Sequence, residues 1–125
     1  MERNTRQRGA IRRVFQRADR PLSTGEVLAG AQSEVAGLGI ATVYRNIRTL
    51  CDEGWLVAVE LPGDSPRYEL QGKPHHHHFH CRRCNKVFEV DGCVPTLNAF
   101  APKGFTLDDH EIVLYGSCAD CLHPT

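Results

Sequence analysis

The sequence of 125 residues has no apolar run near the roughly 20 residues of a membrane span. Met1-Glu2-Arg3 leads into charged residues, where a signal peptide would have an apolar core. We therefore expect a cytoplasmic protein with no membrane partner. Thiols in that compartment stay reduced, so paired cysteines in this chain favour metal binding over disulfides.

Two signatures of zinc enzymes are also missing. The sequence contains no H-E-x-x-H, and no H-x-E segment ahead of a P-C-x-x-C pair. We therefore predict that the protein is not an enzyme and takes no small organic substrate. A zinc enzyme and a zinc-binding carrier are the alternatives from other functional classes. Metal-dependent binding to a specific DNA duplex would argue against both of them.

The formal net charge of the chain is zero, but its two parts carry net charges of opposite sign. Residues 1–55 contain nine arginines and six acidic residues, whereas residues 56–125 contain six basic and nine acidic residues. The offset, roughly +3 against −3 with histidine neutral, favours a nucleic-acid partner for the first part. An excess of three charges is equally compatible with an ordinary solvated surface.

The sequence does contain two cysteine pairs of identical spacing behind a histidine run. Two C-x-x-C turns can close a tetrahedral shell around zinc that leaves no open position. We assign a structural zinc to Cys81, Cys84, Cys118 and Cys121, because a domain of ~50 residues has little core and needs such a site. The histidines of residues 75–80 are different, since neutral imidazoles with carboxylates make sites that can fill and empty.

The first 70 residues have the pattern of a winged helix-turn-helix. Apolar residues recur at helical spacing in three segments, and each segment is predicted to form a helix. The first covers residues 5–17, the second follows a Ser-x-x-Glu capping box at residues 23–26, and the third covers residues 40–53. Residues 55–61 and 67–70 are predicted to form two strands across a Pro- and Gly-containing turn. The helix of residues 40–53 is then the recognition helix.

Apolar core residues occupy one face of this helix. The other faces carry hydrogen-bond donors and a phenol, which are groups that can contact base edges and phosphates. The same side chains would form a solvated face if this were an ordinary core helix. We predict DNA contacts from Thr42, Tyr44, Arg45, Asn46 and Arg48, and phosphate contacts from Arg3, Arg6, Arg8, Arg12 and Arg13.

The second part is predicted to contain a strand at residues 87–90, a short helix at residues 94–101 and an alternating strand at residues 110–115. If residues 75–80 are extended, their side chains alternate between the two faces of a strand. His76, His78 and His80 then point one way and His75 and His77 the other, so that two metal sites can form from one strand.

Several segments together resemble the ferric uptake regulator (Fur) family. Residues 39–47 are similar to its recognition-helix motif, and residues 75–84, 87–89, 110–111 and 115–121 are similar to its metal-binding half, in the same order. The resemblance implies an α+β fold. It places an N-terminal winged helix-turn-helix DNA-binding domain at residues 1–72 and a small C-terminal α/β metal-binding dimerisation domain at residues 73–125.

The resemblance also implies two ligand sets beside the cysteines. The regulatory metal site at a hinge near residues 70–75 would take Glu69, His76, His78 and Glu89. The second site would take His75, His77 and His110. Many members place a glutamate ligand where counting gives Thr96, so Cys93 or Glu111 is expected to supply the missing group.

The family implies a homodimeric, metal-dependent transcriptional repressor, and this chain is most similar to zinc uptake regulators. Iron- and peroxide-sensing members often carry a histidine where this chain has Pro21, and a thiolate from Cys93 would favour zinc over iron. We expect Zn²⁺ to close the hinge, so that the dimer binds a palindromic operator and represses metal-uptake genes. Fe²⁺, Mn²⁺ or peroxide sensing is the alternative within the family.

Overall fold

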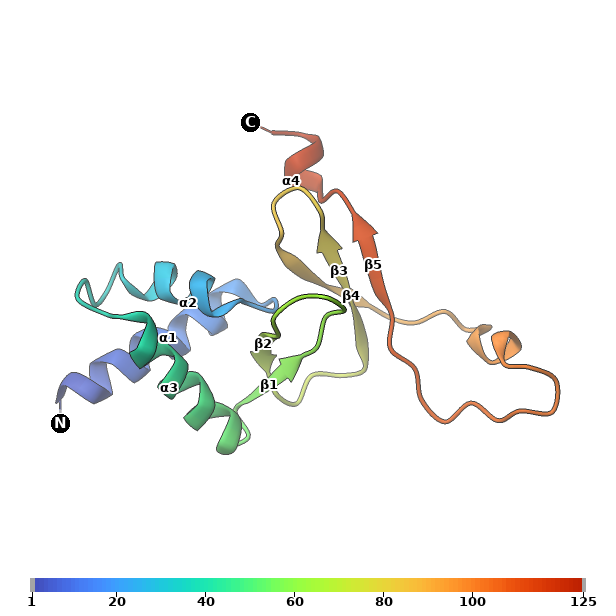
Figure 1. Ribbon diagram of the computed structural model, residues 1–125, viewed down its shortest axis with the longest axis horizontal. Coiled ribbons are helices and arrows are strands. Elements are labelled where there is room, and N and C mark those ends of the chain that lie inside the picture. Colours follow the sequence, from blue (N-terminus) through green and yellow to red (C-terminus); the bar gives the residue numbers. More distant parts are fainter. Residues whose placement is uncertain (1, 125) are drawn as a thin grey trace. The chain divides into compact units, whose positions relative to one another are not determined.

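The computed structural model describes residues 2–124, so that Met1 and Thr125, the outer ends of the predicted domains, lie outside the described residues. The chain divides into two compact units, the first ending at Lys73 and the second beginning at Pro74. Helices dominate the first unit and strands the second (Figure 1), which confirms the α+β class. None of the helices in the described part combines the length and apolar character needed to cross a bilayer.

Three helices and a two-stranded sheet form the first unit. The helices are α1 (Glu2–Ala18), α2 (Thr24–Ala31) and α3 (Ile40–Asp52). They precede β1 (Leu56–Val59) and β2 (Arg67–Leu70), which pair antiparallel. This element order confirms the predicted three helices and two strands, although β1 is shorter than the predicted segment at residues 55–61.

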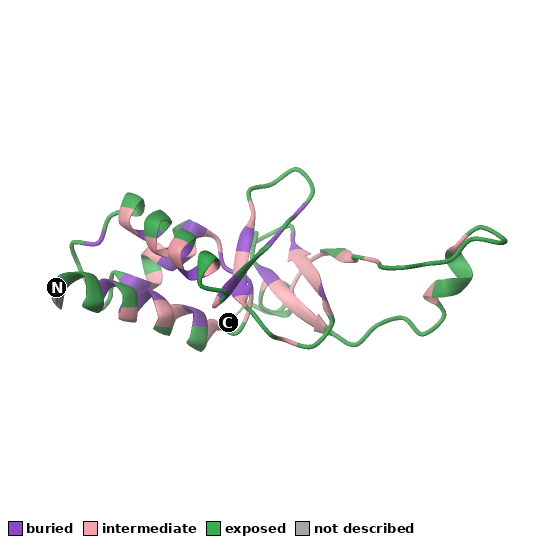
Figure 2. Cartoon of the chain, turned by 90° about the horizontal axis from the view of Figure 1, so that it is seen from below, coloured by how far each residue is buried: buried purple, intermediate pink, exposed green. Residues whose placement is uncertain are grey.

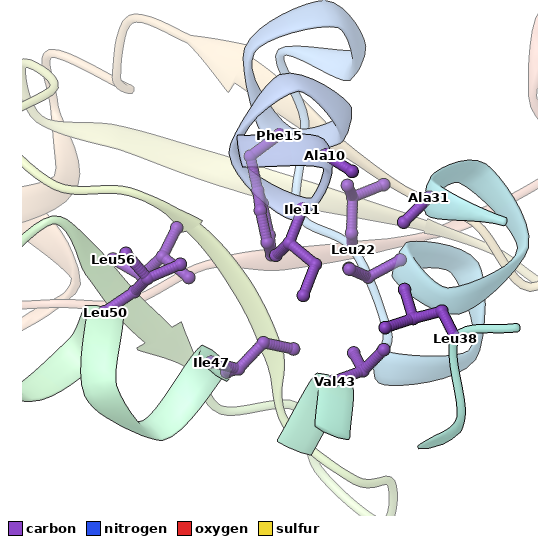
Figure 3. Packing of buried hydrophobic residues seen from close by; sticks show 11 residues of the cluster. Ala10, Ile11, Phe15, Leu22, Ala31, Leu38, Val43, Ile47, Leu50 and Leu56 are labelled. Atoms are coloured by element: carbon purple, nitrogen blue, oxygen red, sulfur yellow. The ribbon is translucent and has the colours of Figure 1, made fainter. Parts of the chain in front are cut away.

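The core of the first unit lies where one face of each helix meets the others (Figure 3). Ile11 and Phe15 of α1 and Val43 and Leu50 of α3 are all at most 1% exposed. Burying such side chains contributes about 1.5–3 kcal/mol each to folding. The apolar spacing therefore fixes which face of α3 turns inward, and the opposite face is left to solvent.

A reciprocal cap starts α2. The Glu26 backbone N–H donates to Ser23 Oγ at 3.1 Å, and the Ser23 N–H donates to Glu26 Oε1 at 3.0 Å, which confirms the capping box. Glu26 also accepts from Arg20 Nη2 at 2.6 Å and lies 3.5 Å from Arg67 Nη1. Burial acts to raise the pKa of Glu26, but the hydrogen bonds from Arg20 and Ser23 outweigh it and hold the pKa below its ordinary value.

A three-stranded sheet with β3 at its centre forms the second unit. β3 (His76–Cys81) pairs antiparallel with β4 (Val87–Asp91) and parallel with β5 (Val113–Gly116). The parallel pairing sets Cys81 opposite Gly116, so both chain segments that carry cysteine pairs leave the sheet at the same end. The short helix α4 (Ala119–Leu122) is not among the predicted elements.

The predicted helix at residues 94–101 is wrong. Only a 3₁₀ turn, η1 (Leu97–Phe100), forms there, and none of its residues is buried. A helix this short is marginal unless it packs an apolar face, and Pro95 lacks one backbone donor. The strand predicted at residues 110–115 begins later, at Val113.

Candidate metal centres

Four cysteine thiols converge at one end of the second sheet. Cys81 ends β3, Cys84 lies in the turn that follows, and Cys118 and Cys121 lie at the start of α4 and within it. The Cys81 and Cys121 Sγ atoms are 3.7 Å apart, those of Cys84 and Cys118 are 3.8 Å apart, and all four lie within 4.8 Å of one another. Zn–S bonds of about 2.3 Å at tetrahedral angles separate the sulfurs by about 3.8 Å. The group therefore has the size of a closed tetrahedral zinc site.

The backbone around Cys81 stabilises its thiolate, which is the metal-binding form. The N–H groups of Cys84 and Cys118 donate to Cys81 Sγ at 3.5 and 3.3 Å. These donors, that of Cys84 first, lower the pKa of Cys81 to about 5, while hydrogen bonding with the Cys118 thiol raises the pKa of Cys121 to about 12. Asn85, at φ 65°, supplies the left-handed turn that this loop requires.

A second group lies on one face of β3 and the residues around it. The Nε2 atoms of His75, His77 and His110 are 3.1–3.2 Å apart, and Cys93 Sγ is 3.2 Å from His77 Nε2 and 3.0 Å from His110 Nε2. A tetrahedral zinc with Zn–N bonds of 2.0–2.1 Å would separate such nitrogens by about 3.3 Å. Of the two expected candidates for the fourth ligand, the group assembled from the described residues contains Cys93 and not Glu111.

His77 is the buried member of this second group, at 4% exposure. Burial lowers the pKa of His77, and the neighbouring His75 and His110 lower it further, because a cation there would be poorly solvated and repelled. The imidazole is therefore neutral at neutral pH, which is the form that binds metal.

The opposite face of β3 carries His76 and His78. Their ring centroids are 4.8 Å apart, and His76 Nε2 lies 3.7 Å from Glu89 Oε1 on β4. Glu69 lies on β2 in the first unit. His80 instead bonds through Nε2 to Asn85 Oδ1, and no metal-binding group of the described residues includes it.

The exposed face of α3 carries the side chains predicted to contact DNA. Val43, Ile47 and Leu50 are buried, whereas Tyr44 is 57% exposed and Arg45 and Arg48 are exposed. Thr42 and Asn46 are half-buried beside them. The Thr42 hydroxyl accepts from Arg45 Nη2 at 3.1 Å, and its carbonyl accepts from Asn46 Nδ2 at 2.9 Å. Donors of the kind that contact nucleic acid thus line one surface of this helix.

Two of the predicted phosphate contacts already have partners within the first unit. The Arg12 guanidinium lies 5.0 Å from the centroid of the Trp55 ring, a cation–π contact. Arg13 forms an ion pair with Glu34 at 2.9 Å. Arg13 would therefore have to release Glu34 in order to reach a phosphate, a constraint that the sequence spacing of 21 residues does not reveal.

A comparison with family models matches residues 2–115 to the Ferric uptake regulator family. The ferric uptake regulation protein of Campylobacter jejuni is 37% identical over 87 residues, which cover 67% of this chain and 55% of that protein. The chain thus spans a little over half the length of this curated relative.

Two solved structures are similar over most of the chain. A zinc-bound manganese uptake regulator superposes with a TM-score of 0.76 at 26% identity, covering 90% of this chain and 87% of that one. FurB from M. tuberculosis, a zinc uptake regulator, superposes with a TM-score of 0.53 at 29% identity over 95% of each chain. These relatives are named for iron, manganese and zinc, so the names alone do not select one metal.

Proposed function

Because this chain belongs to the ferric uptake regulator family, we propose that it is a metal-responsive transcriptional repressor that senses zinc. It would act as a homodimer on double-stranded operator DNA. The observation that carries the proposal is that the second unit contains two separate sulfur- and nitrogen-rich ligand groups, while the first unit presents an exposed, donor-rich helix.

In this proposal, the four-cysteine group holds a permanent structural zinc. Its sulfur spacings of 3.7 and 3.8 Å match a closed tetrahedral shell, and such a shell leaves no position for an activated water. Binding without catalysis is the role that this chemistry supports. The zinc would tie the start of the second unit to its end, where the sheet alone has three short strands.

The sensed metal would bind Glu69, His76 and His78, with Glu89 as a further carboxylate. Glu69 and His76 are only seven positions apart in the sequence but belong to different units. A metal that takes ligands from both units binds the closed arrangement more tightly and therefore shifts the population toward it. This linkage would give two recognition helices in a dimer the spacing of two operator half-sites.

Zinc is the metal that we propose for this switch. Imidazole and carboxylate ligands suit zinc, and the chain has Pro21 where iron- and peroxide-sensing relatives often carry a further histidine. Repression of metal-uptake genes by the zinc-loaded dimer follows, because excess zinc would then stop further uptake. Fe²⁺ or Mn²⁺ in place of Zn²⁺ would keep the mechanism and change the signal.

On DNA, we propose that α3 enters the major groove with its exposed face. Tyr44, Arg45 and Arg48 would reach bases and phosphates, and Thr42 and Asn46 would support them at the same surface. The arginines of α1 would add phosphate contacts and a dependence on salt.

One experiment tests this function. Metal content per chain is measured before and after mild chelation, and DNA from the protein's own promoter region is titrated with Zn²⁺, Fe²⁺ or Mn²⁺ present. Retention of about one zinc per chain, with DNA binding restored by zinc alone, is the expected result. If only iron or manganese restores DNA binding, the proposal that the protein senses zinc is wrong. If no metal changes the DNA affinity, the proposed metal-dependent switch is wrong.

A further inference from the structure

One polar side chain of α1 is buried without a hydrogen-bond partner. Figure 2 shows buried positions recurring among exposed ones along α1, as expected of a helix that packs one face against a core. Gln7 occupies one of these buried positions, at 7% exposure. Within the described residues 2–124, its side-chain amide neither donates nor accepts a hydrogen bond. Native proteins rarely leave a buried amide unbonded, so this one requires an explanation.

Gln7 lines two cavities of the first unit. The first, of about 180 Å³, lies between α1 and α3, and only polar side chains line it: Asn4, Gln7, Arg8, Thr42, Arg45, Asn46 and Thr49. The second, of about 370 Å³, lies between α1 and the connection that leads into α3, and is lined by Arg3, Arg6, Gln7, Val35 and Gly37. The two cavities therefore share one buried amide.

The charged side chains that line these cavities are all positive. They belong to Arg3, Arg6, Arg8 and Arg45, and none of the described lining residues is acidic. The three arginines of α1 in this set are exposed and form no ion pair within the described part of the chain. Such a lining favours an anion as the ligand.

The backbone at the start of α3 favours the same kind of ligand. Its N-cap, Gly39, offers no side-chain cap, and the first turn contains no acidic residue. Val43 donates the first backbone hydrogen bond of the helix, so the N–H groups of residues 40–42 have no acceptor in the described part of the chain. Thr42 of this turn lines the first cavity, and Gly37, just before the N-cap, lines the second. Free N–H groups at a helix N-terminus bind anions, phosphate in particular.

We propose that the two cavities and the first turn of α3 form one phosphate site, and that a phosphodiester group of operator DNA occupies it. The Gln7 amide would donate to a phosphate oxygen, residues 40–42 would supply further N–H donors, and the arginines would balance the charge. Because α1 and α3 both contribute, one bound phosphate would fix the position of α3 in the major groove. The inference rests on the proposed function, since it requires that the chain binds DNA.

Ethylation interference tests the contact made by Gln7. Promoter DNA sparsely ethylated at its phosphates is mixed with full-length protein in saturating zinc, and the bound and free fractions are compared. Ethylation of the phosphate at this site should weaken binding of the unsubstituted chain more strongly than binding of Gln7→Leu, which has already lost the contact. Gln7→Leu should also bind unmodified DNA roughly tenfold or more weakly, because a hydrogen bond to a charged group is lost.

Gln16→Leu is the matched control, because Gln16 is an exposed glutamine of α1 that lines neither cavity. This variant should keep the affinity and the interference pattern of the unsubstituted chain. An interference pattern in Gln7→Leu that equals that of the unsubstituted chain would overturn the proposal.

A pair of substitutions at Gly37 tests the site even if Gln7→Leu does not fold. A Cβ at Gly37 would meet no atom within 4 Å, and its backbone is not left-handed, so a side chain there enters open space at the second cavity. Gly37→Glu should bind promoter DNA roughly tenfold more weakly than Gly37→Gln at low salt, and the difference should shrink as salt rises. Gln16→Glu places the same charge elsewhere on α1 and should have a smaller effect. Equal affinities of the two Gly37 variants would contradict a phosphate beside this residue.

Inorganic phosphate has the same chemistry as the phosphodiester, and nuclear magnetic resonance distinguishes the two sources. The signals of the Gln7 side-chain amide and of the N–H groups of residues 40–42 are followed in the full-length protein. Shifts on addition of a short DNA duplex, with inorganic phosphate effective only at much higher concentration, support the proposal. Shifts with inorganic phosphate and none with the duplex would overturn DNA as the ligand, and shifts with neither would overturn the site.

Failure of this inference differs from failure of the sensing mechanism. Zinc-dependent binding to promoter DNA with the same interference pattern in Gln7→Leu would remove the phosphate site and keep the sensing mechanism. Metal-independent binding with a pattern that depends on Gln7 would remove the sensing mechanism and keep the phosphate site.

Discussion

The sulfurs of Cys81 and Cys121 lie 3.7 Å apart although 40 positions separate them in the sequence. The parallel pairing of β3 with β5 makes this contact possible, because it brings the two C-x-x-C segments to the same end of the sheet. The group therefore joins the beginning of the second unit to its end.

Cys84→Ser should remove the tightly held zinc and unfold the second unit. Apparent binding energies of structural zinc sites are about 10–16 kcal/mol, which exceeds the stability of most small domains. Zinc content by elemental analysis and strand signal by circular dichroism would check this. Cys51→Ser, which changes a cysteine outside every ligand group of the described residues, should keep both. Equal zinc content in the two variants would contradict a structural role for the cysteines.

His78→Ala should stay folded and keep its structural zinc but lose the metal response. His78 lies on β3 opposite Glu89 and belongs to the proposed sensing set, not to the four-cysteine group. We expect DNA affinity in saturating zinc to fall to that of the metal-free protein. His80→Ala serves as the control, because His80 bonds to Asn85 and lies outside the ligand groups of the described residues. A full zinc response in His78→Ala would rule out His78 as a ligand of the sensed metal.

The elements that local patterns determine could be predicted from the sequence. The Ser23–Glu26 capping box, the apolar spacing of α3 and the alternation of side chains along β3 each depend on residues a few positions apart. In the first unit, such short-range rules hold because its core is large enough to bury the faces that they predict. In place of the helix expected at residues 94–101, the described chain forms only the 3₁₀ turn η1, none of whose residues is buried.

The details of the candidate sites depend on contacts between distant residues. Counting along the chain offers both Cys93 and Glu111 as candidates for a ligand, and only the positions of β4 and β5 around β3 bring in Cys93. In the same way, the pairing of Arg13 with Glu34 depends on how α1 packs on the segment after α2. No local pattern encodes either contact.

Arg45→Ala or Tyr44→Ala should weaken binding to promoter DNA by roughly tenfold to a hundredfold, since one specific base contact contributes about 1–3 kcal/mol. Both side chains are exposed on α3, so their removal should change neither stability nor zinc content. A gel-shift titration at fixed salt measures the effect. Lys103→Ala controls for the loss of one positive charge outside the first unit. Unchanged affinity in both α3 variants would remove α3 as the recognition helix.

Glu26→Gln should lower the free energy of unfolding at pH 7 by about 1 kcal/mol, after allowance for solvent screening of a half-buried ion pair. The pKa of Glu26 is lower in the folded protein than its ordinary value of 4.5. The stabilisation is therefore complete above that ordinary value and is lost as the pH falls through the folded pKa. Urea titrations of both proteins at pH 7 and at acid pH should show the difference shrinking with acid, and a constant difference would contradict the ionic contribution.

Gly30→Ala should destabilise the protein, although alanine favours helix formation by about 1 kcal/mol over glycine. A Cβ at Gly30 would lie 2.9 Å from Val14 Cγ1 and 3.1 Å from Cγ2. Val14 is β-branched and lies in α1, where it has one strongly preferred rotamer, so it cannot turn aside. Overpacking costs about 1–3 kcal/mol, which exceeds the helical gain.

A double-mutant cycle separates the two effects of this substitution. In a Val14→Ala background the clash is absent, and Gly30→Ala should then stabilise by up to about 1 kcal/mol in a urea titration. Gly25→Ala in the same helix is the matched control, because its Cβ would meet only Ser23 Oγ at 3.9 Å. If Gly30→Ala has the same effect in both backgrounds, α1 and α2 do not pack through this pair.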